Sequence, residues 1–120
     1  MPKVMVVDDA FSELKVMESI LKHGGCDVLT YIDGAGFEDK AALEHPDVIL
    51  LDVVMPKRNG YEILRALKKD ARTKQIPVVV VTSKNQQSDK DWARRQGADD
   101  YVTKPFTDAD LLAAVHRFSR

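Results

Sequence analysis

The sequence is poor in the residues that form covalent or metal cross-links. Its 120 residues include one cysteine, Cys26, and three histidines. A single thiol cannot form an internal disulfide, and no cluster of cysteine and histidine offers a zinc site. The fold must therefore depend on an apolar core, which a chain of this length can bury without cross-links.

Long hydrophobic runs and an excess of charge are also absent. Apolar runs such as Val48–Leu51 and Val78–Val81 are four residues long, far short of the roughly 20 residues of a membrane span. Residues 1–4 lack the apolar stretch of a signal peptide. With 18 basic and 19 acidic side chains the net charge is −1, which gives no basic surface for nucleic acid or anionic lipid. We expect a cytoplasmic protein that neither binds nucleic acid nor inserts into a membrane.

What the sequence does have is a regular succession of short apolar runs and amphipathic stretches. The runs are continuously apolar, which is typical of strands buried on both faces. The stretches between them place apolar residues at helical spacing and end at turn residues such as Gly24 and Gly97. The predicted strands are Val4–Val7, Val28–Ile32, Val48–Leu51, Pro77–Val81 and Tyr101–Val102, and the predicted helices are Phe11–Leu21, Phe37–Leu43, Tyr61–Leu67, Ser88–Gln96 and Asp108–Phe118.

This order predicts the α/β class, a doubly wound (βα)5 sandwich in which helices cover both faces of a parallel five-stranded sheet. No linker, repeat or low-complexity segment interrupts the pattern. We therefore expect residues 1–120 to form a single domain, with no room for an output domain after the last helix.

Polar residues follow four of the predicted strands at the point where each strand ends. Asp8 and Asp9 follow the first strand, Asp52 the third, Thr82 the fourth and Lys104 the fifth. Each has an ordinary explanation when taken alone, since aspartate often caps helices and lysine is usually a solvated charge. Ligands of open α/β sheets, however, bind outside the carboxyl ends of the strands, so all of these residues are predicted to meet there.

The composition of this group favours phosphoryl chemistry. Three carboxylates would repel one another unless a cation lay among them, and an oxygen-only ligand set suits Mg²⁺ better than zinc. A carboxylate can act as a nucleophile and form an aspartyl phosphate. A metal and a lysine beside it would neutralise charge on the transferred group.

At this point the sequence resembles the receiver domains of two-component response regulators, in particular the stand-alone chemotaxis type. The resemblance covers essentially the whole chain and implies a flavodoxin-like sheet of strand order 2-1-3-4-5. It rests on Val6-Val7-Asp8-Asp9, Pro46–Asp52, Met55-Pro56, Asn59-Gly60, Pro77–Thr82, Gly97-Ala98, Tyr101 and Lys104-Pro105-Phe106.

The resemblance implies a role for each residue of the predicted site. Asp52 would be the phospho-acceptor, and Asp9 would bind Mg²⁺ directly, with Asp8 acting largely through water. The backbone carbonyl of Val54 would complete the metal site. Lys104 would pair with the phosphoryl oxygens.

The family's switch is also implied. Thr82 would donate its hydroxyl to the phosphoryl oxygens, and its movement would let Tyr101 swing inward, so that a new dianionic group biases a bistable loop and ring. Lys104-Pro105 resembles the family's cis peptide, an isomer otherwise found in about 5–6% of such bonds.

The resemblance also implies that two positions next to the site control how long the phosphoryl group stays on Asp52. Val54, two residues after Asp52, offers no hydrogen bond to orient an attacking water, which predicts slow self-dephosphorylation. Lys84, two residues after Thr82, could reach the phosphoryl oxygens or remain solvated.

The function implied is a signalling switch that catalyses only its own phosphorylation and dephosphorylation and is otherwise not an enzyme. A histidine kinase would supply the phosphoryl group, and a downstream effector protein would bind the surface formed by the fourth helix, fifth strand and fifth helix. The chain also resembles the pilus-associated chemotaxis branch, which serves twitching motility or phototaxis, at Thr82–Lys84, Gln86, Asp89-Lys90, Trp92 and Arg95–Ala98. We expect a monomer.

Other functions remain open at this stage. The chain could be a phosphate sink for a sister regulator, or a receiver domain excised from a larger DNA-binding regulator. A flavodoxin-like cofactor carrier would want a Ser/Thr/Gly-rich phosphate loop in place of Asp8-Asp9. A haloacid dehalogenase-type phosphatase would want a second acid at residue 10, which is Ala10.

Overall fold

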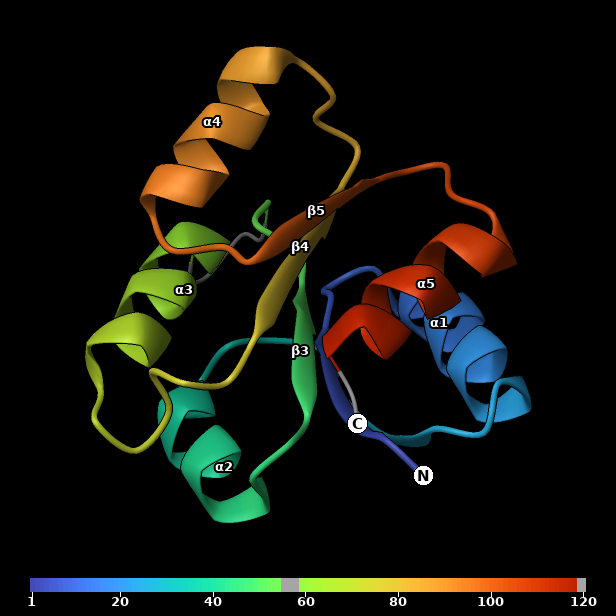
Figure 1. Ribbon diagram of the computed structural model, residues 1–120, viewed down its shortest axis with the longest axis horizontal. Coiled ribbons are helices and arrows are strands. Elements are labelled where there is room, and N and C mark those ends of the chain that lie inside the picture. Colours follow the sequence, from blue (N-terminus) through green and yellow to red (C-terminus); the bar gives the residue numbers. More distant parts are fainter. Residues whose placement is uncertain (55–58, 119–120) are drawn as a thin grey trace.

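Five parallel strands form the centre of the computed structural model, which describes residues 1–54 and 59–118 (Figure 1). The sheet order is β2-β1-β3-β4-β5, and each neighbouring pair is parallel, so the predicted architecture and strand order are confirmed. The elements are β1 (Lys3–Val7), α1 (Phe11–His23), β2 (Asp27–Tyr31), α2 (Phe37–Glu44), β3 (Val48–Leu51), α3 (Gly60–Lys69), β4 (Val78–Thr82), α4 (Gln87–Arg95), β5 (Asp100–Thr103) and α5 (Asp108–Phe118).

The sheet divides the core into two compartments. Helices α1 and α5 cover one face, and α2, α3 and α4 lie on the other (Figure 1). Side chains alternate between the faces of a strand, so Val4 and Val6 of β1 pack with α1 and α5, whereas Met5 and Val7 pack with α2 and α3. This explains why the strands are continuously apolar.

All five predicted helices are present, including the short α2. Its first residue, Phe37, is fully buried and packs edge-to-face on Tyr31, with 5.4 Å between the ring centres. Burial of this ring holds a helix that has little amphipathic pattern of its own. Within the described ranges, no helix has both the length and the apolar character needed to cross a membrane.

The ends of several elements differ from the prediction by one or two residues. Strand β4 begins at Val78 and includes Thr82; Pro77 has no N–H to donate, although its carbonyl accepts from the Ile49 N–H at 2.9 Å. Helix α3 begins at Gly60, one residue early, because the Asn59 side chain caps it by accepting from the Tyr61 N–H at 2.8 Å.

Candidate functional site

The acidic cluster is positioned by the pairing of the two central strands. Val7 of β1 lies opposite Leu51 of β3, so the residues that follow, Asp8 and Asp52, leave the sheet side by side. The Asp52 N–H continues the ladder by donating to the Val7 carbonyl at 3.0 Å. Oxygen atoms of Asp8, Asp9 and Asp52 all lie within 4.8 Å of one another.

The three carboxylates differ in exposure. Asp8 is fully buried and Asp52 is 8% exposed, whereas Asp9 lies at the surface. Backbone groups orient the two buried ones: Asp8 Oδ1 accepts from the Ala10 N–H at 2.9 Å, and Asp52 Oδ1 accepts from the Val54 N–H at 3.0 Å. Each has a second oxygen that can face a cation or a substrate.

The environment of Asp52 disfavours its charged form. Burial raises the pKa of Asp52 to about 6, and the negative charges of Asp8 and Asp9 act in the same direction. The hydrogen bond from Val54 and the positive charge of Lys104 oppose the shift without cancelling it. A cation in this cluster would remove the repulsion, so the charges present favour one.

Lys104 reaches the cluster from the loop after β5. Its backbone N–H donates to the Thr82 carbonyl at 2.8 Å, which continues the pairing of β4 with β5. The ammonium donates to Asp8 Oδ2 at 2.7 Å and lies 3.6 Å from Asp52 Oδ2. Burial works to lower the pKa of Lys104, but hydrogen bonds to Asp8 and Glu13 outweigh it and leave the pKa raised. The Lys104-Pro105 peptide is cis, as predicted.

Thr82 and Tyr101 are connected through the backbone of Lys84. Thr82 is buried, and its hydroxyl oxygen accepts a long hydrogen bond of 3.4 Å from the Lys84 N–H. The Tyr101 hydroxyl donates to the Lys84 carbonyl at 2.7 Å. Burial raises the pKa of Tyr101 to about 12, so this hydroxyl keeps its proton at neutral pH.

Val54 lies at the mouth of the site with 53% of its surface exposed. Together with Val53, Asn59, Tyr61 and Lys84 it lines a pocket of about 230 Å³. The backbone of Val54 contacts the Asp52 carboxylate, and its apolar side chain lines the neighbouring pocket. The Met55-Pro56 motif falls outside the described residues.

One residue of this site, Glu13, was not anticipated from the sequence. Its carboxylate accepts from the Lys104 ammonium at 3.0 Å. Asp8, Asp9 and Asp52 are found by looking immediately after each strand, but Glu13 lies inside α1. Its only sequence signal is a position one helical turn after Asp9, on the helix that starts beside the cluster.

Comparison with known proteins identifies the family. The chain matches the response regulator receiver domain over residues 4–116. It belongs to that family. The receiver is 42% identical to the protein PilH of Pseudomonas aeruginosa over 116 residues, which cover 97% of this chain and 96% of PilH. The predicted resemblance to chemotaxis-type receivers and their pilus-associated branch is thereby confirmed.

Solved structures agree with this assignment. The chemotaxis protein CheY4 of Vibrio cholerae superposes with a TM-score of 0.90 at 31% identity, covering 98% of each chain. The receiver domain of a sensor histidine kinase from Pseudomonas aeruginosa superposes with a TM-score of 0.89 at 26% identity, covering 98% of this chain and 96% of that one. That structure has a magnesium ion coordinated in its active site cleft.

The residues present in this chain suit the same class of ion. Magnesium prefers oxygen ligands and commonly binds through one or two carboxylates completed by water and phosphate. Among the residues that the structure describes, the cluster offers three carboxylates and no nitrogen or sulfur ligand. Two of them are buried side by side, and only one ammonium within the described residues pairs with them, so the donor set fits a divalent cation.

Proposed function

We propose that this receiver is a phosphorylation-dependent signalling switch whose acceptor is Asp52. The observation that carries the proposal is the convergence of Asp8, Asp9, Asp52 and Lys104 at one edge of the sheet, three acids with one ammonium. The phosphoryl donor is a histidine kinase, and the output is an altered contact with an effector protein. Apart from its own phosphorylation and dephosphorylation, the receiver has no enzymatic activity.

The chemical step is a displacement at phosphorus. A carboxylate oxygen of Asp52 attacks the phosphorus of the donor, a new O–P bond forms, and the bond from phosphorus to the donor breaks. With a phosphohistidine donor the imidazole leaves, and with acetyl phosphate the acetate leaves. Lys104 supports the step because its ammonium, 3.6 Å from Asp52 Oδ2, can bind the oxygens of the transferred group.

Magnesium is the cofactor that the site suits. Asp8, Asp9, Asp52 and the backbone carbonyl of Val54 would hold it, and when bound it supplies positive charge to the developing phosphoryl oxygens. Asp9 is exposed and Asp8 is already hydrogen-bonded to Ala10 and Lys104. These contacts support direct binding by Asp9 and a more indirect contribution from Asp8.

The output route runs from the site toward α4. Thr82 is the residue that senses the phosphoryl group, and Tyr101 is the ring that responds. Both contact the backbone of Lys84 in the loop that leads into α4, which supports a coupled movement. We place the effector surface on α4, β5 and α5, and the similarity to PilH supports a role in pilus motility or chemotaxis.

The test is incubation of the full chain with acetyl phosphate, with and without Mg²⁺, followed by intact mass measurement. We expect a single phosphoryl adduct that requires Mg²⁺. Asp52→Asn should abolish it, and Asp47→Asn, at an aspartate before β3, should leave it intact.

Three outcomes would contradict the proposal. An adduct that persists in Asp52→Asn would move the acceptor elsewhere. An adduct formed equally well in a chelator would remove the metal from the mechanism. A folded wild-type protein that takes up no phosphoryl group would be a degenerate receiver that acts through constitutive protein contacts.

A further inference from the structure

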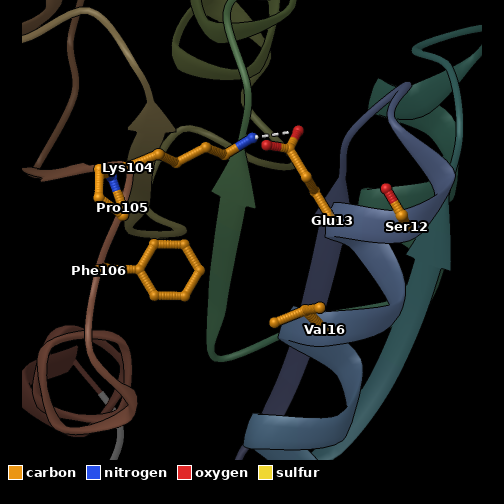
Figure 2. Close-up of a pocket in the computed structure, with 6 residues that line it drawn as sticks. All are labelled: Ser12, Glu13, Val16, Lys104, Pro105 and Phe106. Atoms are coloured by element: carbon orange, nitrogen blue, oxygen red, sulfur yellow. Dashed lines mark hydrogen bonds and ion pairs between the residues drawn. The ribbon is translucent and has the colours of Figure 1, made fainter.

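Glu13 forms an ion pair with the lysine of the site. Figure 2 shows the Lys104 side chain extending from the loop after β5 and meeting the Glu13 carboxylate, which projects from the first turn of α1. Below this ion pair is a pocket of about 270 Å³ with apolar walls from Val16, Pro105 and Phe106. The pair therefore bridges α1 and the β5–α5 loop across the rim of the pocket.

The distances show how the ammonium is shared. Lys104 Nζ lies 2.7 Å from Asp8 Oδ2 and 3.0 Å from Glu13 Oε2, both hydrogen-bonding distances. Its distance to Asp52 Oδ2 is 3.6 Å, which is an ion pair without a hydrogen bond. The hydrogen bonds to Asp8 and Glu13 therefore determine where the ammonium lies.

We propose that Glu13 is a positioning residue that draws the Lys104 ammonium toward α1 and so slows phosphoryl uptake by Asp52. The inference rests on the proposed function, because it concerns the rate of the same reaction. A charge-assisted hydrogen bond from the Lys104 ammonium to a phosphoryl oxygen needs one of its three N–H groups, and the ammonium now donates to Asp8 and Glu13. Glu13 therefore competes with the phosphoryl group for the ammonium.

The two partners of this ion pair differ in exposure. The Glu13 side chain is 49% exposed, against 11% for the Lys104 side chain. Its carboxylate occupies one of the three N–H donors of the Lys104 ammonium. Because Glu13 is half exposed, it can release Lys104 without burying an unpaired charge.

The first test compares the initial rate of phosphorylation by acetyl phosphate at saturating Mg²⁺ in the wild type and in Glu13→Gln. We expect the rate to rise roughly threefold to fivefold, the range set by a single partly exposed ion pair. The matched control is Glu18→Gln, which removes the same charge from the same helix. Glu18 pairs with Lys15 and Lys22, and its variant should keep the wild-type rate.

Two further variants separate contact from charge and from general structure. Glu13→Asp keeps the charge but shortens the side chain by one methylene, so it should show at least half of the increase seen in Glu13→Gln. In a Lys104→Gln background, Glu13→Gln should no longer change the rate, because its effect acts through the ammonium.

The outcomes that would overturn the inference are distinct from failure of the proposed function. If the wild type forms the adduct and folded Glu13→Gln is no faster, Glu13 has no positioning role and the switch assignment stands. A wild-type rate in Glu13→Asp would mean that the charge of residue 13 matters and its contact with Lys104 does not. An equally large rate increase from Glu13→Gln in the Lys104→Gln background would mean that Glu13 does not act through the ammonium. Either result overturns the inference. A wild-type chain that takes up no phosphoryl group would remove both proposals.

Discussion

At the scale of single residues, the side chain two positions after Asp52, the proposed acceptor, is apolar. Val54 donates its backbone N–H to Asp52 but presents only methyl groups to the pocket that it shares with Lys84. Hydrolysis of an aspartyl phosphate needs a water placed in line with the O–P bond, and an amide or carboxylate can orient one. The Val54 side chain would therefore exclude the water that hydrolyses the aspartyl phosphate, or leave that water without a group to orient it.

We expect Val54→Asn to shorten the half-life of the phosphorylated receiver several-fold, by supplying a group that orients the attacking water. The measurement is the decay of the phosphoryl adduct by intact mass after removal of acetyl phosphate. Leu43→Asn, at an exposed apolar position on α2, is the matched control and should leave the decay unchanged. An unaltered half-life in Val54→Asn would show that residue 54 does not limit hydrolysis.

Most of the site could be predicted because it follows from strand ends. Asp8, Asp52 and Lys104 each come directly after a strand, and parallel strands bring their carboxyl ends to one edge. Glu13 could not be found this way, since its contact with Lys104 depends on how α1 packs against the sheet. The link from Thr82 through Lys84 to Tyr101 also depends on loop geometry, about which residue types say little.

At the scale of elements, the start of α3 packs directly against the backbone of Asp52 and Val53. Gly60 donates its N–H to the Val53 carbonyl at 3.1 Å. A Cβ atom on Gly60 would overlap the Asp52 carbonyl oxygen and the Val53 Cα. Both are backbone atoms, so the overlap cannot be relieved by rotating a side chain.

We expect Gly60→Ala to lower the free energy of unfolding by about 1–3 kcal/mol, the usual range for overpacking, and to reduce phosphoryl uptake by displacing Asp52. The control is Gly24→Ala, whose Cβ would meet the end of the flexible Leu112 side chain and should cost less. Urea denaturation measures both. Equal losses in the two variants would mean that the backbone after β3 can move away.

Element types were predictable throughout, but only some element ends were: β3 and α5 have the predicted bounds, and others differ by one or two residues. Continuous apolar runs identify the buried strands, and apolar spacing identifies the helices. The ends depend on single contacts, such as the Asn59 side chain that starts α3 at Gly60. The α2 helix shows a further limit, because the burial of Phe37 against Tyr31 holds a segment whose own pattern is weak.

At the scale of the whole molecule, Asp52 is a source of instability in the metal-free protein. The pKa of Asp52 is raised from 3.8 to about 6 on folding. Between pH 3.8 and about pH 6 the folded state holds a proton on Asp52 that the unfolded state has released. The contribution of Asp52 to the free energy of unfolding therefore falls as the pH rises through this range. Above pH 6 the full cost of keeping a charged Asp52 is present.

We therefore expect Asp52→Asn to stabilise the metal-free receiver at pH 7 by about 1–3 kcal/mol, since each unit of pKa shift corresponds to 1.36 kcal/mol. Well below pH 3.8 the carboxyl is protonated in both states, and the gain should disappear. Urea denaturation in a chelator at pH 7 and at the lowest pH where the protein stays folded measures the difference. A gain independent of pH would assign the effect to packing instead of charge.

The hydrogen bond from Tyr101 ends on a backbone carbonyl, that of Lys84. A carbonyl is present whatever amino acid occupies the position, so substitution at residue 84 changes the side chain beside the pocket without deleting the acceptor for the tyrosine. On the proposed function, a substitution at residue 84 would therefore alter how long a signal lasts and leave the contact that reads it in place. Timing and readout would then be separable at a single residue.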